Sequence, residues 1–167
     1  MALSESLSAE LMQESNGTRK ILQSVTDEHF DWKPHAKSFT LGTLASHLAE
    51  LPSYVTYIIQ NDELDFAKMD YKAPDVHDSA GLMQFFDETI AKAKENLSNV
   101  SDETLMKNWT LRTGDHVIMT LPKAAVLRTM VMNHIVHHRA QLGVYLRLLD
   151  IPVPGVYGPT ADEKVFG

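Results

Sequence analysis

A long helical pattern near the end of the chain is the feature that most restricts the fold. Between about residues 122 and 149, one seam recurs at steps of four, three, four, seven and four residues: Leu127, Val131, His134, His138, Tyr145 and Leu149. This heptad-like spacing is typical of a helix that buries one face against other helices. Pro122 suits the first turn, because its missing N–H would have no helical partner there. The pattern predicts one member of a helical bundle.

Three further helical patterns complete an expected all-α four-helix bundle. They cover about residues 3–25, residues 41–60, and a stretch from residue 79 to at least residue 97. Ser38 or Thr40 can cap the second helix, and Pro52 should kink or interrupt it. Ser101 is expected to cap a further short turn. Because two of the connections are long, at least one crossover connection is expected.

The remaining segments predict less regular structure. Residues 61–77 are polar and indicate a loop, whereas residues 109–121 are rich in threonine, valine and isoleucine around Gly114 and predict a small two-stranded hairpin. The tail from residue 151, with its prolines and glycines, should form an extended strap. A length of 167 residues fits a single domain spanning residues 1–167.

Composition excludes several classes of function. The chain has no cysteine, which rules out disulfides, thiolate metal sites and a cysteine nucleophile. A net charge of −7 with scattered basic residues argues against nucleic-acid binding. No apolar stretch approaches the roughly 20 residues of a membrane span, and the N-terminus does not resemble a secretory signal. We therefore expect a cytoplasmic protein that binds neither nucleic acid nor membrane.

Three histidines stand where the helical patterns place core residues. His134 and His138 are four residues apart, so they share one helix face. His47 lies between Leu44 and Leu51 on the inward face of the second helix. Three neutral imidazoles in a bundle core suit a divalent metal ion, with zinc or nickel expected first and iron, manganese or copper as alternatives. The alternative is a set of hydrogen-bonded core histidines without an ion.

Several nearby residues have two readings each. Gln141 and Glu50 are three residues from His138 and His47, and each either orients its imidazole or is solvated. Tyr54 either packs or places a hydroxyl near the ion, and Arg139 is expected in a surface or interface salt bridge. His137 is the alternative metal ligand if His134 or His138 does not bind the ion. The other histidines are expected to be solvated: His29, His35, His77 and His116.

The histidine segments resemble a known family. The stretch NHIVHHRAQLGVYLRL (residues 133–148) resembles the H-x-x-H-H-R-G-Q-L signature of the DinB-like (YfiT-like) superfamily. FDWKPHAKSFTLGTLASHLAEL (residues 30–51) resembles that family's W-x-P entry into the second helix and its first histidine, and IPVPGVYGPTADE is similar to its closing segment. The similar segments extend over nearly the whole chain and occur in the same order as in the family. One departure is Ala140, where the signature has glycine, and this change can alter the spacing of helices or protomers.

The resemblance implies a fold and a range of activities. It implies an up-down-down-up four-helix bundle, a homodimer, and a metal triad on His47, His134 and His138. Some members of the family join a low-molecular-weight thiol to an electrophile, and others are described as metal-dependent hydrolases. The leading expectation is such a thiol S-transferase acting on a small-molecule substrate, with no catalytic protein side chain. The alternatives are a hydrolase that uses water, and a non-catalytic, stress-related protein that binds a metal or small molecule.

Overall fold

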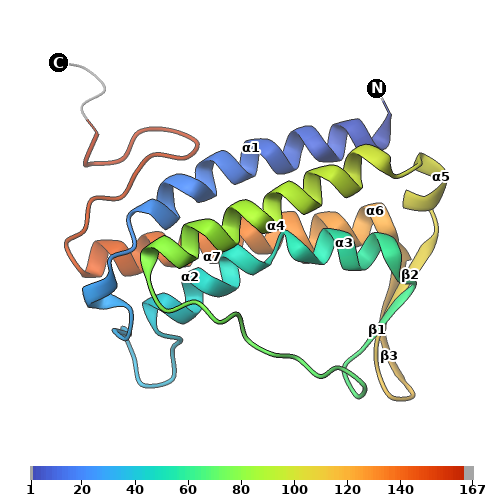
Figure 1. Cartoon of the computed structure of the whole chain (residues 1–167), viewed down its shortest axis with the longest axis horizontal. Helices are drawn as coiled ribbons and strands as arrows, with labels where there is room; N and C mark the ends of the chain where they lie inside the picture. The colour runs from blue at the N-terminus through green and yellow to red at the C-terminus, as the bar shows by residue number, and fades with distance from the viewer. Residues whose placement is uncertain (1, 164–167) are drawn as a thin grey trace.

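The computed structural model describes residues 2–163, which form a mostly helical structure with a small sheet at one end (Figure 1). The helices are α1 (Leu3–Gln23), α2 (Leu41–Glu50), α3 (Ser53–Gln60), α4 (Ser79–Asn99), α5 (Asp102–Leu105), α6 (Lys123–Val126) and α7 (Asn133–Leu148), with a 3-10 turn at Asp27–His29. Helix α1 packs on α4 and α7, and α2 packs on the same two helices. The apolar core lies between them.

The helix boundaries follow the capping residues. The Thr40 hydroxyl accepts a hydrogen bond from the Thr43 N–H at 3.1 Å, and Ser101 caps α5 in the same way. Asp78 caps α4 by accepting from the Gly81 N–H. Helix α2 ends before Pro52 and α3 begins after it, which confirms the expected interruption. None of the helices among residues 2–163 is long and apolar enough to cross a membrane.

A π-helical segment at Leu127–Met132 links α6 to α7 and changes the buried face of this long element. Its wider turns use i→i+5 hydrogen bonds, so the residues that follow are displaced by one position relative to an α-helix. From Val131 the buried face continues through Ile135, Arg139, Leu142 and Leu146. The predicted central seam through His134 and His138 is therefore wrong by one residue. Both histidines lie half-buried at the edge of the core, on the flank where α7 packs on α2.

A three-stranded sheet covers the end of the helices. Strands β2 (Asn108–Thr113) and β3 (His116–Pro122) form the predicted antiparallel hairpin, with Gly114 at φ 56° in its turn. Strand β1 (Glu63–Asp65) pairs parallel with β2. The prediction of a loop over residues 61–77 is thus wrong at these three residues. Three residues are too short to show a period, and their pairing depends on a strand more than 40 residues away.

Arg139 forms a salt bridge, as predicted, but the pair is buried, so its predicted place on the surface or at an interface is wrong. Only 3% of this residue is exposed. Its guanidinium donates to the Glu14 carboxylate at 2.6 Å and to the Glu14 backbone carbonyl at 2.9 Å. The ring of Tyr157 lies 5.0 Å from the guanidinium, and Tyr157 belongs to the C-terminal segment, which has no helix or strand from residue 151 to residue 163. Arg139 thereby fixes the predicted strap to α1 and α7.

Candidate metal centre

The structure brings His47, His134 and His138 together. His47 lies on α2, and the other two lie one turn apart on α7, which packs against α2. One nitrogen from each ring lies within 4.8 Å of the corresponding nitrogens of the other two. All three residues are half-buried, and the side chain of His47 is 22% exposed. The cluster is thus shielded on the core side and reachable from solvent on the other.

The three rings face one another closely. The ring centroid of His47 lies 5.2 Å from that of His134 and 4.9 Å from that of His138. The Nε2 atoms of His134 and His138 are only 2.7 Å apart. Two nitrogens in a tetrahedral site with bonds of 2.0–2.1 Å are about 3.3 Å apart. Binding an ion would therefore require a small rotation of one of these two rings.

Contacts on Nδ1 leave Nε2 of two rings available as a ligand atom. His138 Nδ1 is 2.7 Å from Gln141 Oε1, so this nitrogen carries the proton when the amide oxygen accepts. His47 Nδ1 lies 3.4 Å from Glu50 Oε2. Metal-binding histidines almost always donate their second N–H to such a partner, which fixes both tautomer and ring orientation. Of the two readings of Gln141 and Glu50, the structure favours the one in which they orient the imidazoles.

The electrostatic environment favours neutral imidazoles. The pKa of His138 is lowered to about 4, mainly by burial. The charges of the neighbouring imidazoles also lower this pKa, whereas the hydrogen bond with Gln141 raises it. Burial also lowers the pKa of His134, as does the charge of His47, whereas a backbone hydrogen bond with Met130 opposes the shift. A histidine must be neutral to coordinate a metal ion. At pH 7 both α7 imidazoles are therefore in the form that a cation requires.

Comparisons with known proteins identify the family. The model of the DinB family matches residues 2–164. The chain is 31% identical over 156 residues to the uncharacterized protein YrdA of Bacillus subtilis, covering 90% of this chain and 85% of YrdA. The chain belongs to the DinB family.

Solved structures of DinB-like proteins share the fold. One from Bacillus cereus superposes with a TM-score of 0.71 at 24% identity, covering 92% of this chain and 97% of the other. The DinB-like protein YjoA of Bacillus subtilis gives a TM-score of 0.70 at 16% identity, with 90% and 97% covered. At these identities the similarity concerns the fold of the DinB family alone.

The donor set of this DinB-family chain fits a divalent ion. Three imidazoles converge from two helices, two of them have outer partners on the opposite nitrogen, and burial keeps two neutral. Three protein ligands are the number that leaves a coordination position open for water or substrate. Ala140, the departure from the family signature, is exposed on α7, outside the helix packing of residues 2–163. The cluster could therefore hold a metal ion.

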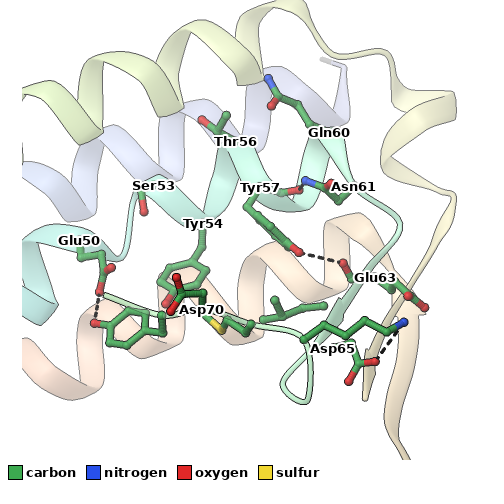
Figure 2. A pocket seen from close by; sticks show the side chains of 14 residues that line it. Glu50, Ser53, Tyr54, Thr56, Tyr57, Gln60, Asn61, Glu63, Asp65 and Asp70 are labelled. Atoms are coloured by element: carbon green, nitrogen blue, oxygen red, sulfur yellow. Dashed lines mark hydrogen bonds and ion pairs between the residues drawn. The ribbon is translucent and has the colours of Figure 1, made fainter. Parts of the chain in front are cut away.

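Two cavities adjoin the cluster, and a third begins at Glu50, one turn from His47. A cavity of about 670 Å³ is lined by His47 together with Phe30, Phe39, Val76 and other residues. A second, of about 460 Å³, includes His138, Gln141 and Lys37. A third, of about 730 Å³, extends from Glu50 along α3 toward Glu63, as Figure 2 shows. His47 and His138 thus each border a space that a small molecule can enter.

The other candidates lie outside the cluster. His137 is exposed, with its ring centroid 4.9 Å from that of His138, and it is not one of the three converging residues. His35, His77 and His116 are exposed as expected, whereas His29 is half-buried and contacts the Thr26 hydroxyl. Tyr54 lines the third cavity. Sequence reasoning missed Tyr71, whose hydroxyl donates to Glu50 at 2.9 Å. In the sequence, Tyr71 is marked only as an aromatic residue within the polar stretch of residues 61–77.

The lowered pKa values predict how metal occupancy depends on pH. Protons compete for an ordinary histidine once the pH falls to about 6.5. Because the pKa values of His134 and His138 lie below that, we expect zinc occupancy to fall at a lower pH than it would with three ordinary histidines. Equilibrium dialysis at stepped pH, followed by elemental analysis, measures the release. Complete loss at pH 6.5 would contradict the shielding of these rings.

Proposed function

We propose that this protein is a metal-dependent enzyme, a thiol S-transferase that joins a low-molecular-weight thiol to an electrophile at the three-histidine centre. The observation that carries the proposal is the convergence of His47, His134 and His138 beside cavities that small molecules can enter. A divalent ion, with zinc or nickel as the first candidates, would supply Lewis-acid chemistry there and favour the thiolate form of a bound thiol at neutral pH.

The framework that we propose for this centre is a four-helix bundle in up-down-down-up order. Packing contacts support it, because α1 and the α2–α3 pair each contact α4, and α1 and α2 each contact α7. These contacts close a ring of four helical units around one core. A closed ring places ligands from facing helices at a fixed separation, which is how bundles build metal sites.

Residues that line two of the cavities would bind the two substrates. The cavity beside His47 has Phe30, Phe39 and Val76 in its walls, and these apolar side chains would hold the electrophile and exclude water. Lys37 lines the cavity beside His138, where its ammonium would bind a carboxylate of the thiol. The thiol sulfur forms a bond to the electrophilic carbon, the leaving group departs with its bonding electrons, and the thiol proton passes to solvent.

A screen of thiols against 1-chloro-2,4-dinitrobenzene tests this function. With zinc- or nickel-loaded protein, we expect a product that carries the added thiol while chloride is released, and no product with the metal-free protein. Lys37→Ala should raise the KM for a carboxylate-bearing thiol by about tenfold with a smaller change in kcat, because one charge-assisted hydrogen bond is lost.

The alternatives give different products. Oxygen from labelled water in the product of an ester or amide substrate, with no thiol required, would replace the transferase with a hydrolase. No turnover in either assay, with metal bound, would favour a metal- or small-molecule-binding protein. In no case do we expect a covalent intermediate on a protein side chain, because the chain has no cysteine and no recognisable serine nucleophile motif.

We also propose a homodimer formed through the outer face of α7. Val144 and Leu148 are 58% and 59% exposed there, and Phe39, 56% exposed, lines a cavity with Val144. Large apolar side chains clustered on one face favour a protein interface. Light scattering should give twice the mass of the chain at micromolar concentration, and Val144→Glu combined with Leu148→Glu should give the monomer. A wild-type monomer at that concentration would contradict the proposal.

A further inference from the structure

Glu50 joins a candidate metal ligand to a distant segment of the chain. One carboxylate oxygen, Oε2, lies 3.4 Å from His47 Nδ1 and accepts a hydrogen bond from the Tyr71 hydroxyl at 2.9 Å. Glu50 follows His47 by one turn of α2, whereas Tyr71 belongs to the connection between β1 and α4. The contact therefore fastens this connection to the histidine cluster.

The Glu50 carboxylate depends on these two neighbours. Its side chain is only 13% exposed, and within residues 2–163 the structure gives it no ion pair with a lysine or arginine. A carboxylate that is largely removed from water requires hydrogen-bond donors to offset its lost hydration. The Tyr71 hydroxyl is one such donor, and His47 Nδ1, at 3.4 Å from Oε2, is near enough to become the other after a small rotation of the ring. Glu50 thus lies between Tyr71 and a candidate metal ligand.

Tyr71 is well suited to remain a donor. Although 47% of the residue is exposed, partial desolvation raises its pKa, and the hydrogen bond and negative charge of Glu50 raise the pKa further, so the hydroxyl keeps its proton. The residue also lines both the cavity beside His47 and the cavity along α3. It therefore holds the carboxylate from the side on which substrate would approach.

We propose that Glu50 and Tyr71 are positioning residues for the three-histidine centre, with Tyr71 fixing Glu50 and Glu50 fixing the ring of His47. This inference rests on the proposed metal site. A carboxylate that accepts from Nδ1–H selects the tautomer whose Nε2 carries the lone pair, and it makes that nitrogen a stronger ligand. Losing either partner frees the ring to rotate away from the other two histidines.

Affinity measurements on matched variants test the proposal. Zinc affinity is measured by competition with a chromophoric chelator for the wild type, Glu50→Gln, Tyr71→Phe and the double variant. We expect Glu50→Gln to weaken binding by about tenfold or more, and Tyr71→Phe by about threefold to tenfold. The double variant should be weakened by about as much as Glu50→Gln alone, because both changes break one network. Tyr57→Phe is the control, since its hydroxyl donates elsewhere, to the Glu63 carbonyl.

The cobalt(II) absorption spectrum supplies a readout that a merely structural role would not change. We expect Glu50→Gln and Tyr71→Phe to shift the ligand-field bands of the cobalt-loaded protein, and Tyr57→Phe to leave them as in the wild type. Circular dichroism of the metal-free variants checks the fold, and Glu50→Gln, which preserves shape, decides the outcome if Tyr71→Phe does not fold.

The possible failures are distinguishable. A wild type that binds neither zinc nor cobalt overturns the proposed metal site and this inference with it. A wild type that binds both ions, with wild-type affinity and spectrum in Glu50→Gln and Tyr71→Phe, overturns only the positioning role. Losses that add in the double variant also overturn the network, because they indicate two independent effects.

Discussion

Replacing Arg139 with alanine is expected to lower the free energy of unfolding by about 3–5 kcal/mol, because the largely buried Glu14 carboxylate loses its cation and keeps only the Tyr157 hydroxyl as a side-chain donor. The guanidinium is almost fully buried, and it also donates to the Glu14 backbone carbonyl and lies over the Tyr157 ring. Its loss would therefore loosen the C-terminal strap as well as α1. Urea denaturation followed by circular dichroism measures the change.

Arg147 provides the matched control. It pairs with Asp162 on the same helix and strap, but its side chain is 47% exposed. Exposed pairs of this kind contribute little to stability, so Arg147→Ala should cost far less than Arg139→Ala. Equal losses for the two variants, or a loss below about 1 kcal/mol for Arg139→Ala, would contradict the importance of this buried pair.

Alanine substitution of any one of the three clustered histidines is expected to abolish tight metal binding. Changes to outer partners typically weaken binding by about 10- to 100-fold, so the loss of a direct ligand at His47, His134 or His138 should exceed 100-fold. Each variant should keep its fold, because all three side chains are half-buried at the edge of the core. Zinc competition with a chelator measures the affinity.

His77→Ala and His116→Ala are the controls for this series. Both side chains are exposed, and neither belongs to the cluster. They should bind zinc as the wild type does. Equal losses in all five variants would mean that histidines act as surface ligands and that the cluster has no special role.

Much of the fold follows from local patterns in the sequence. Apolar periodicity locates the long helices, Pro52 separates α2 from α3, and Gly114 marks the turn of the β2–β3 hairpin. Strand β1 depends on a distant partner, so a local pattern does not indicate it. The π-helical turn was also missed, because a one-residue displacement leaves the apolar spacing of each half intact while rotating one half against the other.

That displacement explains the errors around Arg139. An uninterrupted α-helix places His134 and His138 at the centre of the buried face and Arg139 outside it. With the π-helical turn, Arg139 enters the core and the histidines move to the flank that meets α2. The cluster still forms, because i and i+4 spacing within α7 keeps the two rings on one side.

Contacts between residues of the same helix could be predicted from their spacing in the sequence. Glu50 and Gln141 are three residues from His47 and His138, and each lies against Nδ1 of the imidazole that it was expected to orient. Tyr71 reaches Glu50 from an irregular connection, where the sequence offers no period to align it. Contacts of that kind depend on the path of the chain in space.

Anomalous diffraction from zinc-soaked crystals tests the central claim most directly. Data collected above and below the zinc absorption edge should give one strong peak per chain, with Nε2 of His47, His134 and His138 each about 2.0–2.1 Å from it. In crystals of His134→Ala combined with His138→Ala, the peak should be absent. A wild-type map with no peak between these three rings, or with its strongest peak on other residues, would contradict the three-histidine centre.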